Sequence, residues 1–265
     1  MEQAPSKPVA LTIAGSDPSG GAGLQADLKT FHQLGVYGMS VVTLVTVQNT
    51  TGVSAVEPLD PRLVRRQLDA VLADIPPQAA KTGALGTADI IQQVAEAARD
   101  FAFPLVVDPV MVSKHGAALL EEDASNALAF LLLPHAFLVT PNLHEAAALA
   151  AMPVADLASM ETAARRIADL GPKAVLVKGG HLAGDAVDLL FYEGRVRRFA
   201  VPRIDSRHTH GTGCTFSAAI TAGLARGADL ESAVDCAKRY VTNAISGAAG
   251  LGRGCGPVDH HATTK

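Results

Sequence analysis

The sequence predicts a single α/β domain whose mainly parallel sheet is covered by helices on both faces. Short apolar runs rich in β-forming residues alternate with longer helical stretches, the pattern of repeated β-α-β units. The chain has 265 residues, of which 48% are apolar, enough for one large buried core. No repeat, low-complexity tract or flexible linker divides it, so the domain is expected to span residues 1–265.

Five apolar runs are expected to form the buried strands, because strands covered on both faces read as nearly continuous apolar segments. They are VALTIAG from Val9, SVVTLVTVQN from Ser40, LVVDPVMV from Leu105, FLVTP from Phe137 and AVLVKGG from Ala174. Two further runs, 187–192 and 196–201, flank a short polar break at 193–195. This spacing predicts an antiparallel hairpin at one edge of the sheet.

Seven stretches are expected to be helical, a number that suits a sandwich of three layers. They are 24–34, 61–74, 88–99, 124–132, 160–170, 215–225 and 230–249. The two ends, up to about Lys7 and beyond about Asp259, are expected to fray.

The composition favours a small-molecule partner. Lys and Arg number 22 against 26 Asp and Glu, and neither charge gathers into a block that would bind nucleic acid or an anionic membrane. No apolar run approaches the roughly 18 residues that cross a bilayer, and the first residues lack the apolar segment of a secretory signal. A cytoplasmic protein is expected.

The three cysteines show no CxxC spacing and are expected to be reduced. The nine histidines include no HExxH zinc motif.

A glycine-containing turn, HGTGCT at 210–215, precedes a helix of small residues. Backbone amides at such a helix start converge on anions, and the helix dipole adds positive charge, so the turn is a candidate phosphate site; a plain tight turn is the alternative. Cys214 lies in the first turn, where the dipole would lower its pKa and favour a nucleophile or general base. A buried, inert thiol is the other interpretation.

A second glycine loop, GSDPSGGAG at 15–23, follows the first strand and leads to a helix that carries Asp27. It does not match GxGxxG, and GxxxxGK[ST] is missing from the chain, so any ATP is held in another way. Asn142 and Glu145 follow Pro141 at a predicted helix start, where they could orient a hydrated magnesium ion or simply complement the helix dipole. Lys178 to His181 end a strand, where α/β proteins bind ligands.

Seven motifs in order resemble the hydroxymethylpyrimidine/phosphomethylpyrimidine kinase family of thiamine biosynthesis. They are AGSDPSGGAGLQADLKTF, TLVTVQNT, KTGALG, VDPVMV, TPNLHEA, VKGGH and THGTGCTFSAA. The resemblance implies a ribokinase-like three-layer fold, ATP with Mg²⁺, and a homodimer. It also implies two successive phosphorylations, of 4-amino-5-hydroxymethyl-2-methylpyrimidine and then of its monophosphate to the diphosphate.

The resemblance also implies roles for individual residues. Gln48 would pair with the aminopyrimidine ring, in a pocket lined by Asp27 and Gly15. Cys214 would occupy the place of the catalytic base. The other implied residues are Gly211, Thr212 and Gly213 in the anion hole, Asn142, Lys178 and Gly180 at the nucleotide and its phosphates, and Glu145 at magnesium.

The chain departs from the family pattern at four positions. His208 stands where Asn is expected, Ala84 where some relatives have Met, and His115 and Ala117 where relatives often have Ser and Asp. Ala84 could widen the ring pocket, so these departures bear on substrate breadth.

Three alternatives stay open at this point. A pyridoxal or pyridoxine kinase, or an enzyme with both specificities, is the nearest, because related enzymes accept a flat heteroaromatic alcohol. A sugar kinase is less favoured, since it would have Asp where this chain has Cys214. A non-catalytic protein of the same fold would bind the pyrimidine without consuming ATP.

Overall fold

The computed structural model describes residues 7–114, 116–121, 124–180, 182 and 184–264. This part of the chain forms a nine-stranded sheet in the order β3-β2-β1-β4-β5-β6-β7-β8-β9. The strands are β1 (Val9–Ser16), β2 (Tyr37–Asn49), β3 (Gly52–Pro58), β4 (Ala79–Thr82), β5 (Leu105–Val107), β6 (Leu138–Val139), β7 (Ala174–Lys178), β8 (Ala186–Tyr192) and β9 (Arg195–Val201). The six strands β2, β1, β4, β5, β6 and β7 are parallel to one another. At the edges, β3 runs antiparallel to β2, β8 antiparallel to β7, and β9 antiparallel to β8.

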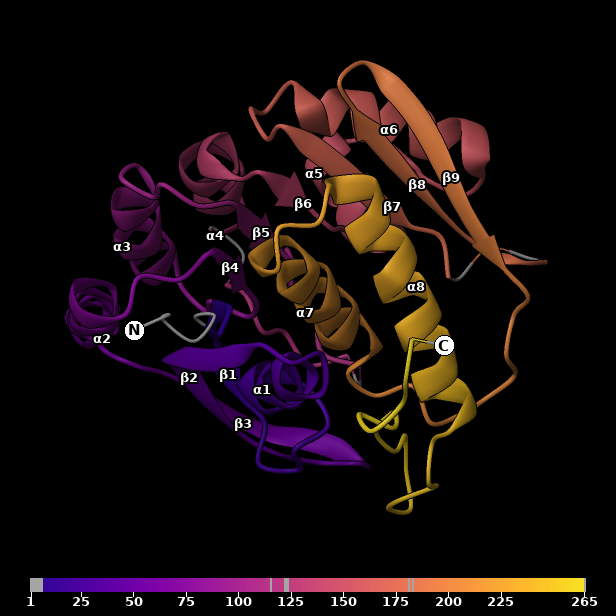
Figure 1. Ribbon diagram of the computed structural model, residues 1–265, viewed down its shortest axis with the longest axis horizontal. Helices are drawn as coiled ribbons and strands as arrows, with labels where there is room; N and C mark the ends of the chain where they lie inside the picture. The colour runs from indigo at the N-terminus through magenta and orange to yellow at the C-terminus, as the bar shows by residue number, and fades with distance from the viewer. Residues whose placement is uncertain (1–6, 115, 122–123, 181, 183, 265) are drawn as a thin grey trace, which may run out of the picture.

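Helices cover both faces of the sheet, as the sandwich prediction requires. Figure 1 shows α7 and α8 side by side with α1 on one face, and α2, α3 and α6 on the other. The helical elements are α1 (Gly23–Gln33), α2 (Pro61–Asp74), α3 (Ala88–Ala98), α4 (Ala124–Ala127), the π-helical η1 (Leu128–Leu132), the short 3₁₀ turn η2 (Leu133–His135), α5 (Leu143–Ala150), α6 (Leu157–Ala168), α7 (Thr212–Ala225) and α8 (Leu230–Ser246). Separate apolar cores fill the two interfaces. The predicted three-layer α/β fold is confirmed.

Local capping explains where the helices begin. The Asp60 side chain accepts a hydrogen bond from the amide of Arg62, and Pro61 takes the first helical position, so α2 spans the predicted 61–74. α7 begins at Thr212, three residues before the predicted start, because Gly211 adopts a left-handed conformation (φ 80°) as its N-cap. Thr212 and Gly213 therefore belong to the first turn of the helix together with Cys214, which was already predicted there.

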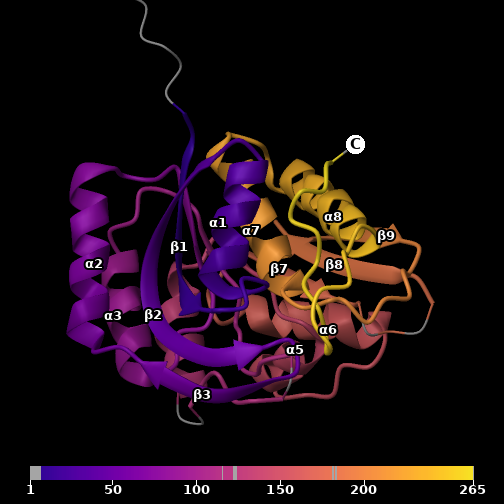
Figure 2. The same ribbon diagram turned by 90° about the horizontal axis from the view of Figure 1, so that it is seen from below.

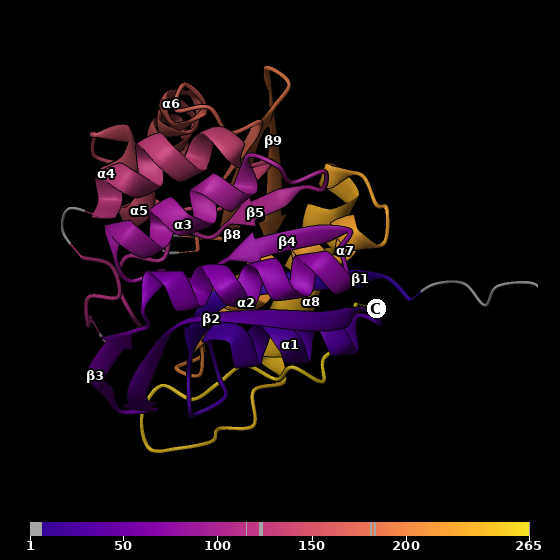
Figure 3. The same ribbon diagram turned by 90° about the vertical axis from the view of Figure 1, so that its left-hand side faces the viewer.

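The hairpin prediction is confirmed by β8 and β9, which pair antiparallel at one edge. At the opposite edge, β3 adds an antiparallel strand that the sequence analysis did not predict, and it forms a long ribbon with β2 (Figure 3). The four-residue β4 was also missing from the predicted elements, and α5 was predicted only by its start near Asn142.

The expectation that the chain frays beyond Asp259 is wrong for the residues described there. The hydroxyl of Tyr240 donates to the carbonyl of His260 (2.9 Å), and the side chain of Gln33 donates to the carbonyl of Ala262 (3.0 Å). Upstream of this point, the amide of Gly254 donates to the Thr50 hydroxyl at the end of β2 (3.3 Å). Figure 2 shows the C-terminal segment passing from α8 toward the end of β2. The tail therefore belongs to the folded domain.

Among the described helices, none combines the length and the apolar character needed to cross a membrane.

Candidate active site

The candidate site lies at the carboxyl edge of the parallel strands. The order of the sheet places β2 on one side of β1 and β4 on the other, so the direction in which strands are added reverses at β1. In α/β proteins, ligands bind in the crevice beyond such a reversal. The ends of β1, β4, β5, β6 and β7 and the first turn of α7 all contribute side chains to this region.

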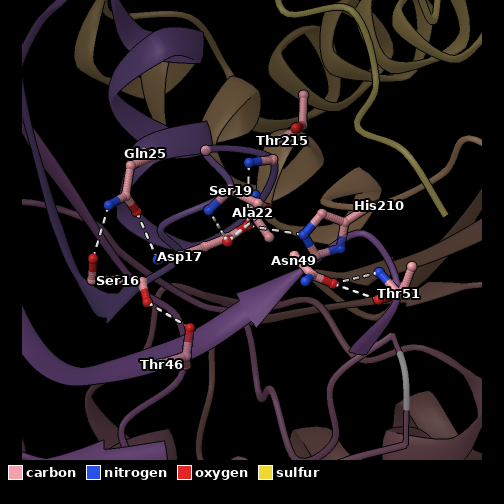
Figure 4. A network of polar contacts seen from close by, with 12 residues as sticks. Ser16, Asp17, Ser19, Ala22, Gln25, Thr46, Asn49, Thr51, His210 and Thr215 are labelled. Atoms are coloured by element: carbon pink, nitrogen blue, oxygen red, sulfur yellow. Dashed lines mark hydrogen bonds and ion pairs between the residues drawn. The ribbon is translucent and has the colours of Figure 1, made fainter. Parts of the chain in front are cut away.

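Asp17 organises the glycine loop at 15–23, which follows β1. Its carboxylate accepts hydrogen bonds from the amides of Ser19 (2.8 Å), Gly21 (3.1 Å) and Ala22 (2.8 Å) and from the Ser19 hydroxyl (2.7 Å). Figure 4 shows the carboxylate at the centre of these contacts. Burial opposes its ionisation, but the hydrogen bonds from His210, Ser19 and the loop amides outweigh burial and lower the pKa of Asp17 to about 2. The loop is therefore held by a buried carboxylate.

Asp17 also joins the two glycine loops. Its Oδ2 lies 2.9 Å from Nε2 of His210, the first residue of the other glycine loop at 210–215. A Cβ atom at Gly211 would lie 1.8 Å from the carbonyl oxygen of Gly21, so the two loops touch through backbone atoms. Side chains at these positions would separate the loops, which explains why both are glycine-rich.

The first turn of α7 leaves backbone donors available. Within the described chain, the amides of Gly213 and Cys214 have no hydrogen-bond partner, as expected at a helix N-terminus. The amide of Thr212 differs, because it donates to the carbonyl of Thr209 at 3.3 Å, and the Thr212 hydroxyl donates to the same carbonyl at 2.8 Å. Of the three residues predicted for the anion hole, Gly211 and Gly213 thus have amides without a partner in the described chain, whereas the amide of Thr212 is occupied.

Lys178 lies beside these amides. It ends β7, and its Nζ would be 3.4 Å from a Cβ atom at Gly213. Its ammonium donates to Oδ1 of Asp108 (2.8 Å), which also accepts from the Thr140 hydroxyl (3.2 Å). Burial disfavours the charged ammonium, but the carboxylates of Asp108 and Glu145 outweigh it and raise the pKa of Lys178. The charged ammonium is therefore favoured beside the free amides.

The sequence analysis did not single out Asp108, although its VDPVMV motif contains the residue. Asp108 directly follows β5, is 2% exposed, and accepts a further hydrogen bond from Ser217 of α7 (3.3 Å). It thus fixes Lys178 against the start of α7. Gly180, predicted near the nucleotide, follows in the same turn as Lys178, and its carbonyl accepts a hydrogen bond from Arg203. His181 of the same motif lies outside the described residues.

Asn142 and Glu145 form a reciprocal capping box at the start of α5. Oδ1 of Asn142 accepts from the Glu145 amide (2.9 Å), and Oε2 of Glu145 accepts from the Asn142 amide (2.8 Å). Asn142 is the N-cap, so Pro141 precedes the helix and does not open it as predicted. Burial raises the pKa of Glu145 to about 7, although Lys178 acts in the opposite direction.

These residues fit a magnesium ion that arrives with a nucleotide. The described residues include no group of three or more His, Cys, Asp or Glu side chains placed to hold a metal by themselves. Magnesium bound to phosphates usually keeps several waters and needs one or two carboxylates. Glu145 has one oxygen outside the capping box, and Asp108 and Lys178 lie close enough to influence its ionisation.

The predicted ring-binding residues are brought near one another only in part. Gln48 is half-buried near the end of β2, and its side-chain amide makes no hydrogen bond within the described chain. Gly15 is the next-to-last residue of β1, and a Cβ atom at Gly15 would lie 3.6 Å from Cβ of Ala84. Ala84 therefore lies beside Gly15, a residue predicted to line the ring pocket that Ala84 could widen.

Asp27 departs from the prediction. It is fully buried, and its two oxygens bind the Thr12 hydroxyl (2.6 Å) and the Lys81 ammonium (2.8 Å). A carboxylate with both oxygens occupied in the interior does not line an open pocket, so its predicted place there is corrected. Its neighbour Lys81 was not singled out from the sequence.

Of the two interpretations of Cys214, a lowered pKa and a buried thiol, the structure supports the buried thiol. Burial of the sulfur raises its pKa to about 11, against the opposing effects of the Lys81 ammonium and a hydrogen bond from the Gly23 amide. Helix position alone predicted a thiolate, but desolvation dominates here. The residue as a whole is nevertheless partly exposed.

The remaining family departures have local roles. His208 Nδ1 accepts a hydrogen bond from the Gly256 amide (3.2 Å), which connects the loop before α7 to the C-terminal segment. The amide of Ala117 donates to the Ser113 hydroxyl (3.0 Å) in a turn. His115 lies outside the described residues.

Comparison with known proteins gives a family match over most of the chain. Residues 17–259 match the family described as phosphomethylpyrimidine kinase. A hydroxymethylpyrimidine/phosphomethylpyrimidine kinase of Streptomyces coelicolor is 50% identical over 253 residues, which cover 96% of this chain and 94% of the relative.

Two solved structures are also similar. A Bacillus subtilis pyridoxal kinase, solved as an ADP complex, has a TM-score of 0.91 and 41% identity and covers 97% of this chain and 98% of its own. A phosphomethylpyrimidine kinase of Clostridium difficile has a TM-score of 0.81 and 44% identity, with coverage of 90% and 100%. The structural similarity thus includes one kinase named for pyridoxal and one named for phosphomethylpyrimidine.

Proposed function

The chain belongs to the phosphomethylpyrimidine kinase family, and we propose that it phosphorylates 4-amino-5-hydroxymethyl-2-methylpyrimidine and then its monophosphate, with ATP as donor, in thiamine biosynthesis. The observation that carries this proposal is the match over residues 17–259, which includes the turn at 210–215 and the glycine loop at 15–23 from Asp17 onward. The arrangement of Lys178 beside the free amides of α7 supports phosphoryl transfer, because such donors stabilise negative charge on phosphate oxygens.

We propose the following division of roles. The amides of Gly213 and Cys214 and the ammonium of Lys178 face the transferring phosphoryl group and stabilise its charge. Asp108 holds Lys178 in place. Together they form a positive, preorganised site at which little rearrangement is needed during the reaction.

Cys214 is proposed as the proton acceptor. Its thiolate takes the proton from the substrate hydroxyl while the hydroxyl oxygen attacks the γ-phosphorus and the bond to the bridging oxygen of ADP breaks. Because burial raises the pKa of Cys214 to about 11, only a small fraction of the enzyme holds the thiolate at neutral pH. The proposed base is thus present in only a small fraction of the enzyme, but it has a high affinity for the proton.

A magnesium ion bound with the nucleotide would supply further positive charge between the phosphates. Glu145 and Asn142 are proposed as the residues that hold it, and Gly180 as part of the nucleotide site. Gln48 is proposed to read the aminopyrimidine edge, because its half-buried amide offers a donor and an acceptor that no described residue uses.

A homodimer in the cytoplasm is proposed as the working form. The β2–β3 ribbon supports it, because Val45 and Val47 on β2 are 43% and 56% exposed. Exposed apolar side chains grouped on one element are typical of contact surfaces.

A pyridoxal kinase, or an enzyme of both specificities, is the second candidate, since the Bacillus subtilis structure covers nearly the whole chain at 41% identity. An ATP-consumption assay with the pyrimidine alcohol, its monophosphate, pyridoxine and ribose separates the candidates. We expect turnover with the first two. A preference for pyridoxine would replace the proposed substrate, and binding without turnover would exclude a kinase.

A further inference from the structure

A buried ion pair lies behind the turn that follows β7. Nζ of Lys238 on α8 is 2.6 Å from Oδ2 of Asp188 on β8, and the two side chains are 8% and 5% exposed. Asp188 and Leu190 lie on the same face of β8, because side chains alternate along a strand, and Leu190 belongs to the apolar core that includes Ala237 of α8. The pair therefore connects β8 to the helix that covers it.

The other carboxylate oxygen of Asp188 binds the backbone of the turn. Oδ1 accepts a hydrogen bond from the amide of Gly179 at 3.0 Å. Asp188 is the register partner of Lys178 across β7 and β8, so this bond forms directly after Lys178. A Cβ atom at Gly179 would lie 2.0 Å from the carbonyl oxygen of Val187, so the turn lies directly against β8 at this point. One carboxylate thus holds the backbone between Lys178 and Gly180.

This backbone leads into the proposed nucleotide site. Lys178, before Gly179, lies beside the free amides of α7. Gly180, after it, is exposed, and no atom lies within 4 Å of an added Cβ. The guanidinium of Arg203 donates to three carbonyls farther along, those of Gly180, Leu182 and Gly184. The described part of the turn is therefore held by two groups, and it leaves Gly180 open.

Packing alone does not require charges at this position. Replacing a buried ion pair by apolar residues of similar volume is often neutral or even stabilising, because desolvation offsets the attraction between the charges. Burial raises the pKa of Asp188, and the Lys238 ammonium and the Gly179 amide act in the opposite direction, so the carboxylate depends on both partners. What the pair supplies is a rigid acceptor for the Gly179 amide.

We propose that Asp188, held by Lys238, is a positioning residue that fixes the backbone of Gly179. The fixed backbone presents Lys178 and Gly180 to the phosphates of the bound nucleotide. Asp188 acts through the Gly179 amide and exchanges no proton in the reaction. Such preorganisation matters because phosphoryl transfer depends mainly on the placement of charged and polar groups. The inference rests on the proposed function, which assigns this edge of the sheet to the nucleotide.

The test compares two variants that lack both charges and differ only at position 188. Asp188→Asn/Lys238→Met keeps a side-chain oxygen that can accept from the Gly179 amide, whereas Asp188→Leu/Lys238→Met has none. Neither variant leaves an unpaired buried charge. Isothermal titration calorimetry measures the binding of ADP with magnesium, and circular dichroism checks that each variant is folded. Asp188→Ala/Lys238→Met is a second variant without the acceptor, for the case in which leucine does not fit the site.

We expect the leucine variant to bind ADP about tenfold or more weakly than the parent, and its kcat/KM for ATP to fall about 100-fold, because a misplacement of about 1 Å can cost that much. The asparagine variant should bind ADP like the parent. In both variants KM for the alcohol should stay unchanged, because the alcohol is assigned to residues of β1 and β2.

Asp229→Ala controls for a loss of stability alone. Asp229 caps the start of α8 by accepting from the Ser232 amide (2.9 Å), so its loss should lower the melting temperature and leave ADP binding unchanged. Parent-like ADP binding in a folded variant without the acceptor would overturn the inference. An equal loss of binding in the asparagine and leucine variants would also overturn it, because the bond to Gly179 would then not be the cause.

The failure of the proposed function is a separate outcome. A parent that binds no ADP would overturn the proposed kinase and this inference together. ADP binding needs no alcohol, so the result for Asp188 does not depend on which alcohol is the substrate.

Discussion

Oδ2 of Asp17 and Nε2 of His210 lie 2.9 Å apart, although 193 residues separate them in the sequence. Each belongs to one of the two glycine loops, and the contact holds the loop after β1 against the start of α7. The loop that borders the proposed ring pocket is thus attached to the turn that bears the free amides.

Asp17→Asn is expected to lower the free energy of unfolding at neutral pH by about 2 kcal/mol, because the hydrogen bonds to the Asp17 carboxylate lower its pKa in the folded chain to about 2, from an ordinary value of 3.8. Because the pKa of Asp17 is lower in the folded than in the unfolded chain, its carboxylate stabilises the fold at pH values above about 4. This contribution is lost as the pH falls from about 4 to about 2. Urea unfolding at pH 3 and pH 7 measures the difference. An equal difference between parent and variant at both values would contradict the role of the charge.

Cys214→Ala is expected to lower kcat by about 10²- to 10⁴-fold, the range for loss of a positioned proton acceptor, with little change in substrate affinity. The parent should also show kcat rising with pH from 7 to 9, because the active form is the thiolate and its pKa lies near 11. Steady-state rates across this range test both points. A flat profile in the parent would count against the thiolate as base.

Gly213→Val is expected to fold but to lose about 100-fold or more in kcat, by analogy with the loss of an oxyanion donor. A Cβ atom there meets the flexible end of Lys178 at 3.4 Å, so the new side chain displaces the cation rather than the backbone. Gly52→Ala is a matched control, because no atom lies within 4 Å of its added Cβ. Normal turnover of a folded Gly213→Val enzyme would remove this turn from the mechanism.

The fold could be predicted from the sequence where local signals are strong. The helix 61–74 combines an Asp cap with a following Pro, and the hairpin of β8 and β9 has a two-residue turn at Glu193 and Gly194 with the backbone φ angles of 49° and 75°. By contrast, β4 has only four residues, and its AAKT sequence lacks β-branched side chains until Thr82. Its place in the sheet comes from pairing with β1 and β5.

The sequence motifs predicted which segments form the candidate site, but not which of their side chains contact one another or how those side chains are charged. Asp108 is an acid after a strand, and its role depends on Lys178, which is 70 residues away and is brought close only by the order of the sheet. The pKa of Cys214 could not be predicted from helix position, because the burial that raises it arises from packing against other elements. Sequence patterns identify residue types, whereas charge states depend on the folded surroundings.

Glu145→Gln is expected to raise the magnesium concentration needed for half-maximal activity, because the variant loses the carboxylate charge. Glutamine still satisfies the capping box, so α5 should keep its start. Magnesium titrations of the two enzymes measure the change. Superimposed titrations would leave Glu145 as a capping residue only.

Stability measurements give an independent check on the charge of Glu145. Burial raises its pKa from 4.5 to about 7, so the folded chain favours the protonated carboxyl. The free energy of unfolding of the parent should therefore fall as the pH rises from about 4.5 to 7, and Glu145→Gln should lack this component. Urea unfolding at pH 5 and pH 8 measures it.

Gln48→Leu is expected to reduce kcat/KM for the pyrimidine alcohol by roughly 5- to 150-fold, which corresponds to about 1–3 kcal/mol for polar groups left buried without partners. The amide of Gln48 offers a carbonyl acceptor and an NH₂ donor, and the aminopyrimidine presents the complementary ring nitrogen and exocyclic amine. Pyridoxine lacks this pair, so its kcat/KM should fall much less.

The decisive quantity is the ratio of kcat/KM for the pyrimidine alcohol to that for pyridoxine, which should fall toward one in Gln48→Leu. Asn49→Ala is a nearby control, because Asn49 already binds the amide and hydroxyl of Thr51 (2.8 and 2.7 Å) and is not assigned to the ring. An unchanged ratio in Gln48→Leu would exclude the glutamine as the reader of the ring. Better turnover of pyridoxine by the parent would instead assign the enzyme to vitamin B6 phosphorylation, because the same loops and amides serve either alcohol.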